Sequence, residues 1–180
     1  MKIYALRHGL TEYNKLGKTN GQIVDDPLAK EGLEQIRNIV PHMPKGIAKI
    51  YSSDLLRARQ TAELINETLQ LPIEFCKELR EVNLGTLAGK SWDDINAEQS
   101  RDVSLEYRTL KYDFHQFGGE SVEDVRKRIS TLMQILKERD AESVLLITHG
   151  GIIRFLYLFF NQERTEKVEN LSIHEFTDAQ

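Results

Sequence analysis

Cysteine is almost absent from this chain of 180 residues, in which Cys76 is the only one. A single cysteine excludes an internal disulfide framework and a cysteine-rich zinc site. Long apolar runs are absent as well: Ile152–Phe160 is interrupted by Arg154 and is too short to span a bilayer. The N-terminus has neither the apolar stretch nor the cleavage site of a signal peptide. We therefore expect a reduced, cytoplasmic protein with no membrane partner.

An excess of basic residues is also lacking. The 24 Lys and Arg stand against 28 Asp and Glu, which gives a formal net charge of -4 and an isoelectric point near 5.8. Nucleic acids and anionic membranes need a basic face, so we expect no nucleic-acid partner. A small anionic substrate needs only a local basic pocket, so the net charge does not exclude an enzyme that acts on such a substrate. The length is typical of one domain, which we predict over residues 1–180.

Strand-like and helix-like segments alternate along the chain. Two continuous apolar runs, Ile3–Leu6 and Val144–Ile147, predict strands buried on both faces, and two further segments are strand candidates. Apolar residues spaced by three and four predict helices between them. The strands are expected at Ile3–Leu6, Ile47–Tyr51, Ile73–Cys76 and Val144–Ile147, and the helices at Leu33–Val40, Leu55–Leu69 and Val122–Leu136. This alternation predicts an α/β fold, a three-layer α/β/α sandwich with a mostly parallel central sheet.

Two segments have a less regular pattern. Residues 83–117 have poor periodicity and several glycines, and we expect a partly helical excursion over the sheet rather than a second domain. The run Ile152–Phe160 is expected to be a core helix. Apolar surface left over on that helix could form the contact of a homodimer.

Reactive residue types follow the ends of the expected strands. In parallel sheets, ligands gather beyond the carboxyl ends of the strands. Two histidines, two arginines and a glutamate should therefore come together at one edge of the sheet. They lie in the segments Arg7-His8-Gly9, Ser53-Asp54 with Arg57, Leu79-Arg80-Glu81 and Thr148-His149-Gly150-Gly151.

This combination suits the transfer of a phosphoryl group. A neutral imidazole is nucleophilic near pH 7 and can form a covalent intermediate. Arginine keeps its charge and matches phosphate oxygens with planar donors. A carboxyl group can protonate a leaving oxygen and later deprotonate water. None of these steps requires a metal ion, and the expected ligand is a small phosphorylated metabolite.

Five blocks of sequence resemble one family in the same order, from about residue 2 to residue 155. They resemble the histidine phosphatase superfamily, and within it the branch of cofactor-dependent phosphoglycerate mutases and their phosphatase relatives. The blocks are Leu6-Arg7-His8-Gly9 with Thr11, Glu12 and Asn14; Ser53-Asp54-Leu55-Leu56-Arg57-Ala58 with Gln60-Thr61-Ala62; Leu79-Arg80-Glu81; Gly118-Gly119-Glu120-Ser121; and Thr148-His149-Gly150-Gly151.

The resemblance implies a role for each residue at the strand ends. It implies that His8 is the phosphorylated nucleophile and that Glu81 is the general acid and base. It also implies a substrate-contacting loop at Asn20-Gly21. The same resemblance implies that the phosphoryl group is held by Arg7, Arg57 and His149, with Asn14 and the backbone at Gly150 assisting.

Phosphatase and mutase are both compatible with these motifs. The mutases carry a tyrosine where this chain has Leu84, and a much longer segment between Glu81 and Gly119 that brings arginines to the substrate carboxylate. Arg101 and Arg108 could substitute for those arginines. A mutase must exclude water, whereas a phosphatase admits it, so the short segment favours a phosphatase.

Among the phosphatases, the length and motifs look like those of small members such as the α-ribazole phosphatases. Such an enzyme needs no cofactor, whereas a cofactor-dependent mutase needs a bisphosphorylated primer. A noncatalytic module that binds a phosphorylated ligand or a protein partner is the alternative from another class.

The remaining aromatic and histidine residues have no catalytic pattern. A patch of five such residues in the irregular segment forms either a small satellite core or a lid over the leaving group. Its members are Tyr107, Tyr112, Phe114, His115 and Phe117. His42, His115 and His174 are expected on the surface or in packing, and Cys76 is expected to be an inert buried thiol.

Overall fold

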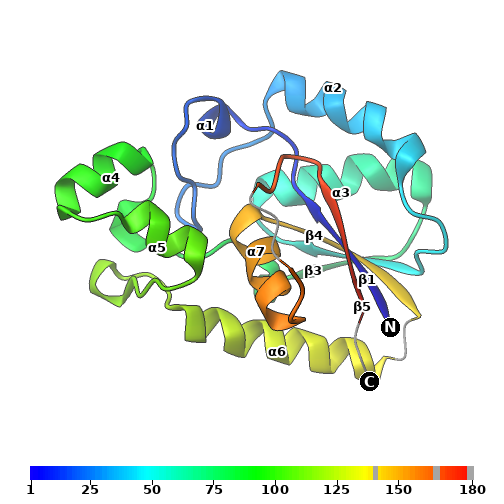
Figure 1. Ribbon diagram of the computed structural model, residues 1–180. Helices are drawn as coiled ribbons and strands as arrows, with labels where there is room; N and C mark the ends of the chain where they lie inside the picture. Colours follow the sequence, from blue (N-terminus) through cyan, green and yellow to red (C-terminus); the bar gives the residue numbers. More distant parts are fainter. Residues whose placement is uncertain (140–141, 164–166, 178–180) are drawn as a thin grey trace.

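A five-stranded sheet forms the centre of the protein in the computed structural model, which describes residues 1–139, 142–163 and 167–177 (Figure 1). The strand order is β3-β2-β4-β1-β5. All neighbouring strands are parallel except β1 and β5, which are antiparallel. The strands are β1 (Lys2–Arg7), β2 (Lys49–Ser53), β3 (Ile73–Cys76), β4 (Ser143–Thr148) and β5 (Ile173–Thr177).

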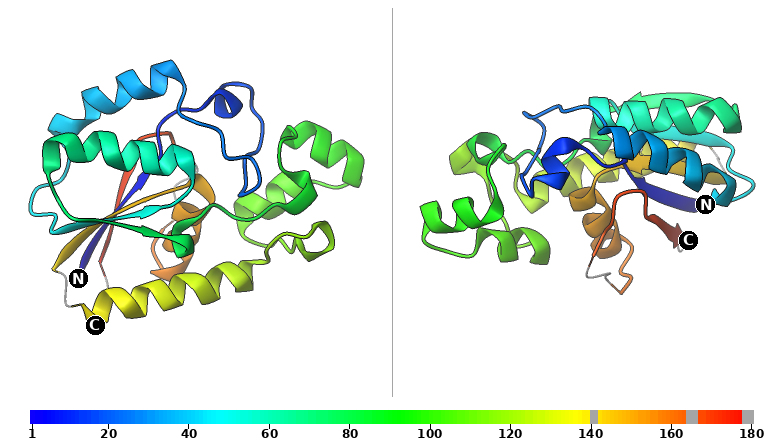
Figure 2. Two further views of the ribbon diagram at one scale, coloured as in Figure 1. Left: turned by 180° about the vertical axis from the view of Figure 1, so that it is seen from behind. Right: turned by 90° about the horizontal axis from the view of Figure 1, so that it is seen from above.

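Helices cover both faces of the sheet. Figures 1 and 2 show α2 and α3 on one face and α6 and α7 on the other. The described helices are α1 (Glu12–Lys15), α2 (Lys30–Ile39), α3 (Leu56–Leu69), α4 (Trp92–Gln99), α5 (Val103–Thr109), α6 (Val122–Glu138) and α7 (Gly150–Phe159). This arrangement confirms the predicted α/β fold with a mostly parallel central sheet. None of the helices in these described ranges has the length and apolar character needed to cross a membrane.

Strand β1 shows how the two faces are filled. Successive side chains of a strand point to opposite faces. Ile3 and Ala5 accordingly join the core under α6 and α7, while Tyr4 and Leu6 join the core under α2 and α3. The strand is therefore buried on both sides, as its continuous apolar run predicted.

Strand β5 was not predicted from the sequence. It pairs with β1 at the edge of the sheet and alternates exposed with buried residues, the buried ones being His174 and Phe176. A histidine at a buried position hides the apolar alternation that identifies a strand. His174 is accommodated because Tyr157 and Ser172 each form a hydrogen bond with its ring.

The irregular segment is partly helical, as predicted, but it does not lie over the sheet as expected. Helices α4 and α5 lie to one side of the sheet (Figure 1). The two ends of the excursion meet closely, since the Glu120 amide donates to the Asn83 carbonyl at 2.8 Å. A Cβ on Gly85 would lie 1.8 Å from the Phe117 carbonyl oxygen, and one on Gly119 would lie 2.4 Å from that of Asn83. Both positions require glycine because the two chain segments touch there.

Candidate active site

The parallel pairing of β1 with β4 brings the two predicted histidines together. Arg7, the last residue of β1, is paired with Thr148, the last residue of β4. A histidine directly follows each of these two residues. The His8 amide donates to the Thr148 carbonyl at 2.9 Å, and the ring centres of His8 and His149 lie 5.0 Å apart. The convergence expected at the sheet edge is therefore present.

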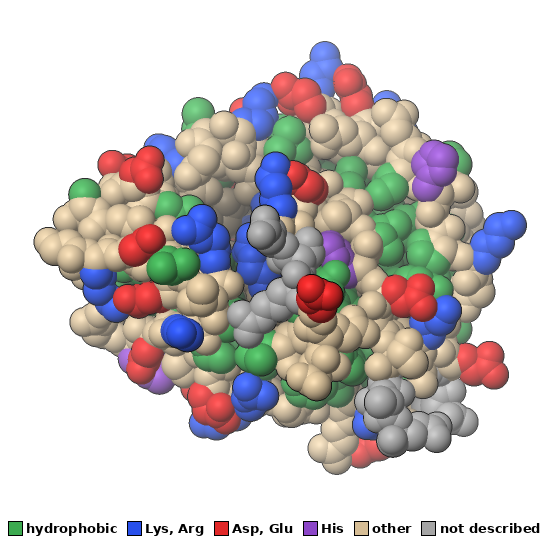
Figure 3. All heavy atoms as spheres, viewed as in Figure 1, with side chains coloured by type: hydrophobic (Ala, Val, Ile, Leu, Met, Phe, Trp, Pro, Cys, Tyr) green, Lys and Arg blue, Asp and Glu red, His purple; other side chains and the backbone are tan. Residues whose placement is uncertain are grey.

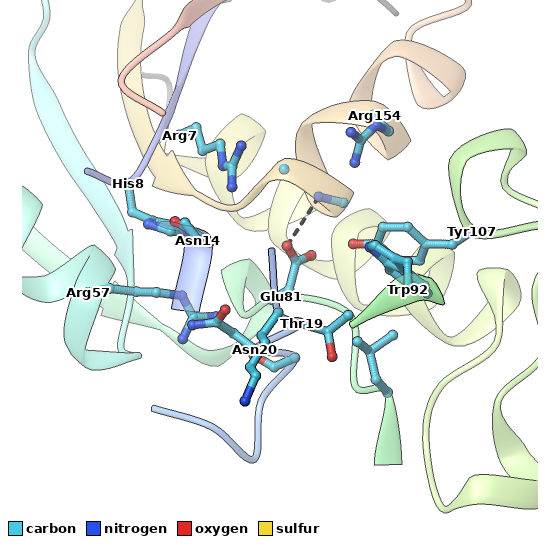
Figure 4. Close-up of a pocket in the computed structure, with 15 residues that line it drawn as sticks. Arg7, His8, Asn14, Thr19, Asn20, Arg57, Glu81, Trp92, Tyr107 and Arg154 are labelled. Atoms are coloured by element: carbon cyan, nitrogen blue, oxygen red, sulfur yellow. Dashed lines mark hydrogen bonds between the residues drawn. The ribbon is translucent and has the colours of Figure 1, made fainter. Parts of the chain in front are cut away.

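A pocket of about 160 Å³ opens beside these residues (Figure 4). Figure 3 shows Lys and Arg side chains gathered around a hollow in the surface on the side of α4 and α5. Residues lining the pocket are Arg7, His8, Asn14, Lys18, Thr19, Asn20, Gly21, Arg57, Glu81, Leu84, Trp92, Tyr107, Gly150, Gly151 and Arg154. This set includes all the predicted site residues except His149.

A backbone hydrogen bond determines the tautomer of His8. The Gly9 carbonyl oxygen lies 2.7 Å from Nδ1 of the ring and can only accept, so Nδ1 carries the hydrogen. Nε2 then keeps a free electron pair. Burial, followed by the positive charges of Arg57 and Arg7, holds the pKa of His8 well below its usual value. The imidazole is therefore neutral at physiological pH, with one nitrogen available for attack.

The two predicted arginines are fixed by backbone carbonyls. Arg57 donates from Nη2 to Gly21 at 2.9 Å and from Nη1 to Val24 at 3.2 Å. Arg7 donates from Nη1 to Val168 at 2.6 Å. The Nε of each guanidinium is buried without a partner among the described residues. Burial lowers the pKa of both groups, yet arginine remains charged, so each directs an unsatisfied cationic donor near His8.

His149 lies next to His8 but does not line the pocket. Its Nε2 lies 2.8 Å from the Ser53 hydroxyl, and its Nδ1 is buried with no partner in the described part of the chain. Burial, together with the charge of Arg57, holds the pKa of His149 well below its usual value. A neutral ring with one orphaned nitrogen is a feature that an additional ligand would satisfy.

Asn14 is oriented by a residue that the sequence did not indicate. Asn170 donates from Nδ2 to the side-chain oxygen of Asn14 at 3.0 Å, which fixes Asn14 with its amide nitrogen on the other side. The same Asn170 nitrogen donates to the carbonyls of His8 and Gly9. Asn170 thus ties the loop before β5 to the segment that carries His8. Asn170 lies 162 residues from His8 along the chain, so no local sequence pattern indicates that the two are in contact.

Glu81 projects into the pocket from the segment after β3. Its Oε1 accepts from the Val82 amide at 2.9 Å, and its Oε2 accepts from the Gly151 amide at 3.2 Å (Figure 4). A Cβ on Gly151 would lie 2.2 Å from the Tyr107 hydroxyl and 2.4 Å from Oε1 of Glu81, so a larger residue there would displace Glu81 or Tyr107. The neighbouring Arg80 instead pairs with Asp54 through two contacts of 2.6 Å.

A network of polar side chains holds the backbone of Glu81. Gln22 donates to the Glu81 carbonyl at 2.8 Å, and Arg128 donates to it at 3.3 Å. Glu120 accepts from both of these side chains and from the Asn83 amide. Glu120 therefore supports the segment that carries Glu81.

The predicted loop at Asn20-Gly21 lines the pocket. The Asn20 amide nitrogen donates to the carboxylate of Asp26. The Gly21 carbonyl accepts from Arg57, and the positive φ of Gly21, 57°, suits glycine. The loop therefore both borders the pocket and holds Arg57 in place.

Helices α4, α5 and α7 complete the pocket with Trp92, Tyr107 and Arg154, of which the sequence indicated only Tyr107, as a member of the aromatic patch. Trp92 and Tyr107 form an aromatic wall, with ring centres 5.0 Å apart, and the Arg154 guanidinium lies 5.9 Å from the centre of the Tyr107 ring. Arg101 and Arg108, the two arginines suggested as substitutes for those of the mutases, do not line the pocket. Arg101 pairs with Glu106, and Arg108 contacts Ser104.

The aromatic patch belongs mainly to the core. Tyr112 and Phe114 are buried and stack with ring centres 4.9 Å apart, within the same core as α6 and α7. Tyr107 is the member of the patch that borders the pocket. His115 is exposed and pairs with Asp113 and Asp124, as expected of a surface histidine.

Cys76 is an unreactive, buried thiol. Its side chain is buried, and burial raises the pKa of the thiol to about 12. The reactive thiolate is therefore essentially unpopulated at neutral pH, as the sequence led us to expect.

Comparisons with known proteins extend over almost the whole chain. The sequence model of the histidine phosphatase superfamily (branch 1) matches residues 3–177. A metal-independent phosphoserine phosphatase of Arabidopsis thaliana is 34% identical, over 96% of this chain and 74% of its own length. A probable phosphoglycerate mutase of Escherichia coli, GpmB, is 30% identical, over 83% of this chain and 70% of its own length.

Solved structures give the same result. The mycobacterial glucosyl-3-phosphoglycerate phosphatase, solved in complex with VO3, has a TM-score of 0.85 and 29% sequence identity. The match covers 97% of this chain and 91% of that one. The phosphatase relatives confirm the predicted enzyme class, a phosphoric monoester hydrolase. With motifs, fold and relatives in agreement, this chain belongs to the histidine phosphatase superfamily.

Proposed function

We propose that the protein hydrolyses small phosphomonoesters through a phosphohistidine intermediate formed on His8. The observation that carries the proposal is the hydrogen bond from Nδ1 of His8 to the Gly9 carbonyl. It leaves Nε2 unprotonated at the edge of a pocket that also contains the buried Arg57 and the half-buried Arg7. A nucleophile aligned in advance and surrounded by cationic donors suits attack on a phosphorus atom.

In the first step, the electron pair on Nε2 of His8 forms a bond to phosphorus while the ester P–O bond breaks. Glu81, in its protonated form, gives its proton to the departing oxygen, and the alcohol leaves. His8 then carries the phosphoryl group on Nε2 and retains its hydrogen on Nδ1. The cationic ring is stabilised by the Gly9 carbonyl that accepts from Nδ1.

In the second step, a water molecule attacks the same phosphorus atom. Glu81, now a carboxylate, takes a proton from that water, and the P–N bond breaks. Inorganic phosphate leaves, Nε2 regains its electron pair and Glu81 is protonated again. The balance is one ester and one water consumed, with one alcohol and one phosphate released.

The unsatisfied donors around His8 suit the oxygens of the transferred group. Arg7 and Arg57 each have a buried Nε without a partner among the described residues, and Asn14 has its amide nitrogen free of the Asn170 contact. In this proposal His149 carries its hydrogen on Nδ1, accepts from the Ser53 hydroxyl at Nε2 and donates to a phosphoryl oxygen. The Gly150 backbone lies beside Arg7 and completes the cradle. Preorganised donors of this kind stabilise the charge that develops during transfer.

A phosphatase fits these observations better than a mutase. Arg101 and Arg108 do not line the pocket, so the short excursion does not reproduce the arginines of the mutases. A phosphatase and a probable mutase both stand among the relatives, and the first is named for phosphoserine. The candidate substrates are therefore small phosphomonoesters such as phosphoserine or an α-ribazole-like phosphate, and the second candidate activity is a phosphoglycerate mutase.

The test is phosphate release from an aryl phosphate and a panel of phosphomonoesters, in the presence of a chelator. The wild type and His42→Ala, which changes an exposed histidine outside the pocket, should release phosphate, and His8→Ala should not. Short incubation with a labelled ester should label the wild type but not His8→Ala. Label retained in His8→Ala would contradict the assignment of the nucleophile. Isomerisation of phosphoglycerate that depends on a bisphosphate primer, without phosphate release, would establish the mutase instead. Binding without turnover would indicate the noncatalytic module.

A further inference from the structure

The pocket contains more positive charge than one phosphoryl group uses. Four cationic side chains line it, namely Arg7, Lys18, Arg57 and Arg154, whereas Glu81 is the single carboxylate among the lining residues. Arg7 and Arg57 flank His8 and, in the function proposed above, hold the transferred group. Arg154 and Lys18 remain without a role in that chemistry.

Arg154 is the more distinctive of the two because it is half-buried yet unpaired. Within residues 1–139, 142–163 and 167–177, it makes no hydrogen bond and no ion pair. Its neighbours in the pocket are the Tyr107 ring, 5.9 Å away, and the Gly150 backbone, where a Cβ would lie 3.7 Å from Nη1. A partly desolvated guanidinium without a counter-charge is a costly arrangement unless a ligand supplies one.

Arg154 borders the phosphoryl cradle, because a Cβ on Gly150 would lie 3.5 Å from Nε of Arg7 and 3.7 Å from Nη1 of Arg154. It follows Gly150 by one helical turn of α7, so it lies on the same face of the helix. In Figure 4 it lies with Tyr107 and Trp92, on the side of the pocket away from His8 and Arg57, with Glu81 between the two groups. Because Glu81 is the proposed proton donor to the leaving oxygen, Arg154 lies where the alcohol portion of an ester would extend.

The charge of Arg154 limits what can occupy this second position. The pocket, about 160 Å³ in volume and open to the surface, has room for a leaving group beside the phosphoryl group. One guanidinium matches one carboxylate through two parallel hydrogen bonds, whereas a second phosphate dianion would call for more than one such cation. The Trp92 and Tyr107 rings bound the remaining space and exclude water from one side of the contact.

We propose that the pocket selects phosphomonoesters whose alcohol portion carries a carboxylate a few bonds from the ester oxygen, and that Arg154 binds this carboxylate. The inference rests on the proposed phosphatase function and adds its specificity. Lys18, on the exposed rim, contributes attraction for the doubly anionic substrate without a fixed contact. Arg154 therefore acts on substrate choice rather than on the transfer itself.

The test uses two probes that differ in a single group, 3-phosphoglycerate, which has a carboxylate, and glycerol 3-phosphate, which has a hydroxymethyl group instead. The readout is the ratio of kcat/KM for the first probe to that for the second. The wild type should prefer 3-phosphoglycerate, and Arg154→Met should lower the ratio about tenfold or more, as expected for the loss of a hydrogen-bonded charge pair. Arg154→Lys should retain part of the preference because it keeps the charge.

Arg59→Met is the matched control. Arg59 is also half-buried and lies over an aromatic ring, that of Phe75, at 4.2 Å, but outside the pocket. The ratio should be the same in Arg59→Met as in the wild type. A wild-type ratio near one, or a ratio unchanged by Arg154→Met, would overturn the inference and leave the phosphatase proposal intact.

A binding measurement separates failure of this inference from failure of the proposed function. Calorimetry on His8→Ala, with and without Arg154→Met, measures the affinity for both probes without turnover. The carboxylate probe should bind more tightly to His8→Ala and lose that advantage in the double variant. If no ester is hydrolysed by the wild type, the phosphatase proposal fails, and equal affinity for the two probes would then overturn the carboxylate site as well.

Discussion

The two sides of the pocket differ in how firmly their side chains are held. On the sheet side, His8 and Arg57 are buried, Arg7 is half-buried, and each donates to a backbone carbonyl. On the side of α4 and α5, the pocket is bounded by the rings of Trp92 and Tyr107 and by Arg154, which has no hydrogen-bond or ion-pair partner among the described residues. The first side is suited to one reaction on any phosphoryl group, because its donors are fixed before the substrate arrives. The second side is suited to choosing among leaving groups.

Substitution of Glu81, the proposed proton donor, should lower activity more than any other change described below. It tests whether Glu81 acts with the side chains of the sheet side in the transfer of the phosphoryl group. Glu81→Gln should lower kcat for alkyl phosphates by about 10²–10⁴-fold, because the leaving oxygen then departs without a proton. An aryl phosphate, whose leaving group needs less protonation, should suffer less. Steady-state kinetics on both ester types measures this difference. Glu78→Gln, three residues earlier, is the control and should resemble the wild type. An equal loss on both ester types would argue against the acid role.

The pH dependence of stability tests whether the two histidines are held neutral. The folded-state pKa values of His8 and His149 lie well below the unfolded value near 6.5. The unfolded chain therefore binds more protons below that pH, and stability falls as the pH falls. Each histidine should cost about 1.4 kcal/mol between pH 7.5 and 5.5. Urea unfolding at the two pH values measures the change, and His149→Gln should remove about half of it. An unchanged slope in that variant would contradict a neutral, buried His149.

Weakening the hydrogen-bond network that holds the backbone of Glu81 should lower kcat less than substitution of Glu81 itself. Glu120→Gln keeps the shape of the side chain but weakens its charged contacts with Arg128, which loosens the segment carrying Glu81. We expect a fall in kcat of about tenfold, larger for alkyl than for aryl phosphates, with little change in KM. Glu123→Gln, at the exposed start of α6, is the matched control. A rise in KM with kcat unchanged would show that Glu120 acts on binding rather than on the proton donor.

The aromatic wall should show the smallest effect, which appears in substrate ranking. Trp92→Ala should alter the order of kcat/KM values across a panel of esters by several-fold, while activity on an aryl phosphate changes less. The exposed Leu105, on α5 but outside the pocket, provides the control variant Leu105→Ala. If all substrates lose activity equally, α4 and α5 do not contribute to selection.

The same contrast explains what the sequence predicted well. His8 and His149 directly follow buried strands, and Arg57 lies in the first turn of the helix after β2. Because the strands are parallel, their ends meet, and these residues could be placed together from the order of the expected strands. Helices α3 and α6 were predicted equally well, since they keep an apolar spacing of three and four over several turns, whereas α1, α4 and α5 were not predicted individually.

The missed residues act through contacts that local patterns do not encode. Asn170 reaches His8 from a loop 162 residues away, and Gln22 contacts Glu81 from an irregular segment. Arg154 interrupts an apolar helix in the sequence, but its role depends on which helix face meets the pocket. Strand β5 was missed because a buried histidine takes an apolar position.

The narrow join between the excursion and the rest of the molecule has a practical consequence for engineering. The chain leaves and re-enters the sheet-bearing body at Asn83 and Glu120, which are hydrogen-bonded to one another at 2.8 Å. A segment of another length, closed by the same glycines, could be grafted between these two points without changing the distance that it must span. Because loop-closure entropy varies slowly with length, closing such a segment costs little stability, provided that the graft keeps apolar side chains such as Phe114 that pack in the core with α6 and α7. The contribution of Trp92 and Tyr107 to leaving-group preference could then be exchanged between enzymes as a cassette, while Arg154 and the reaction centre are inherited unaltered.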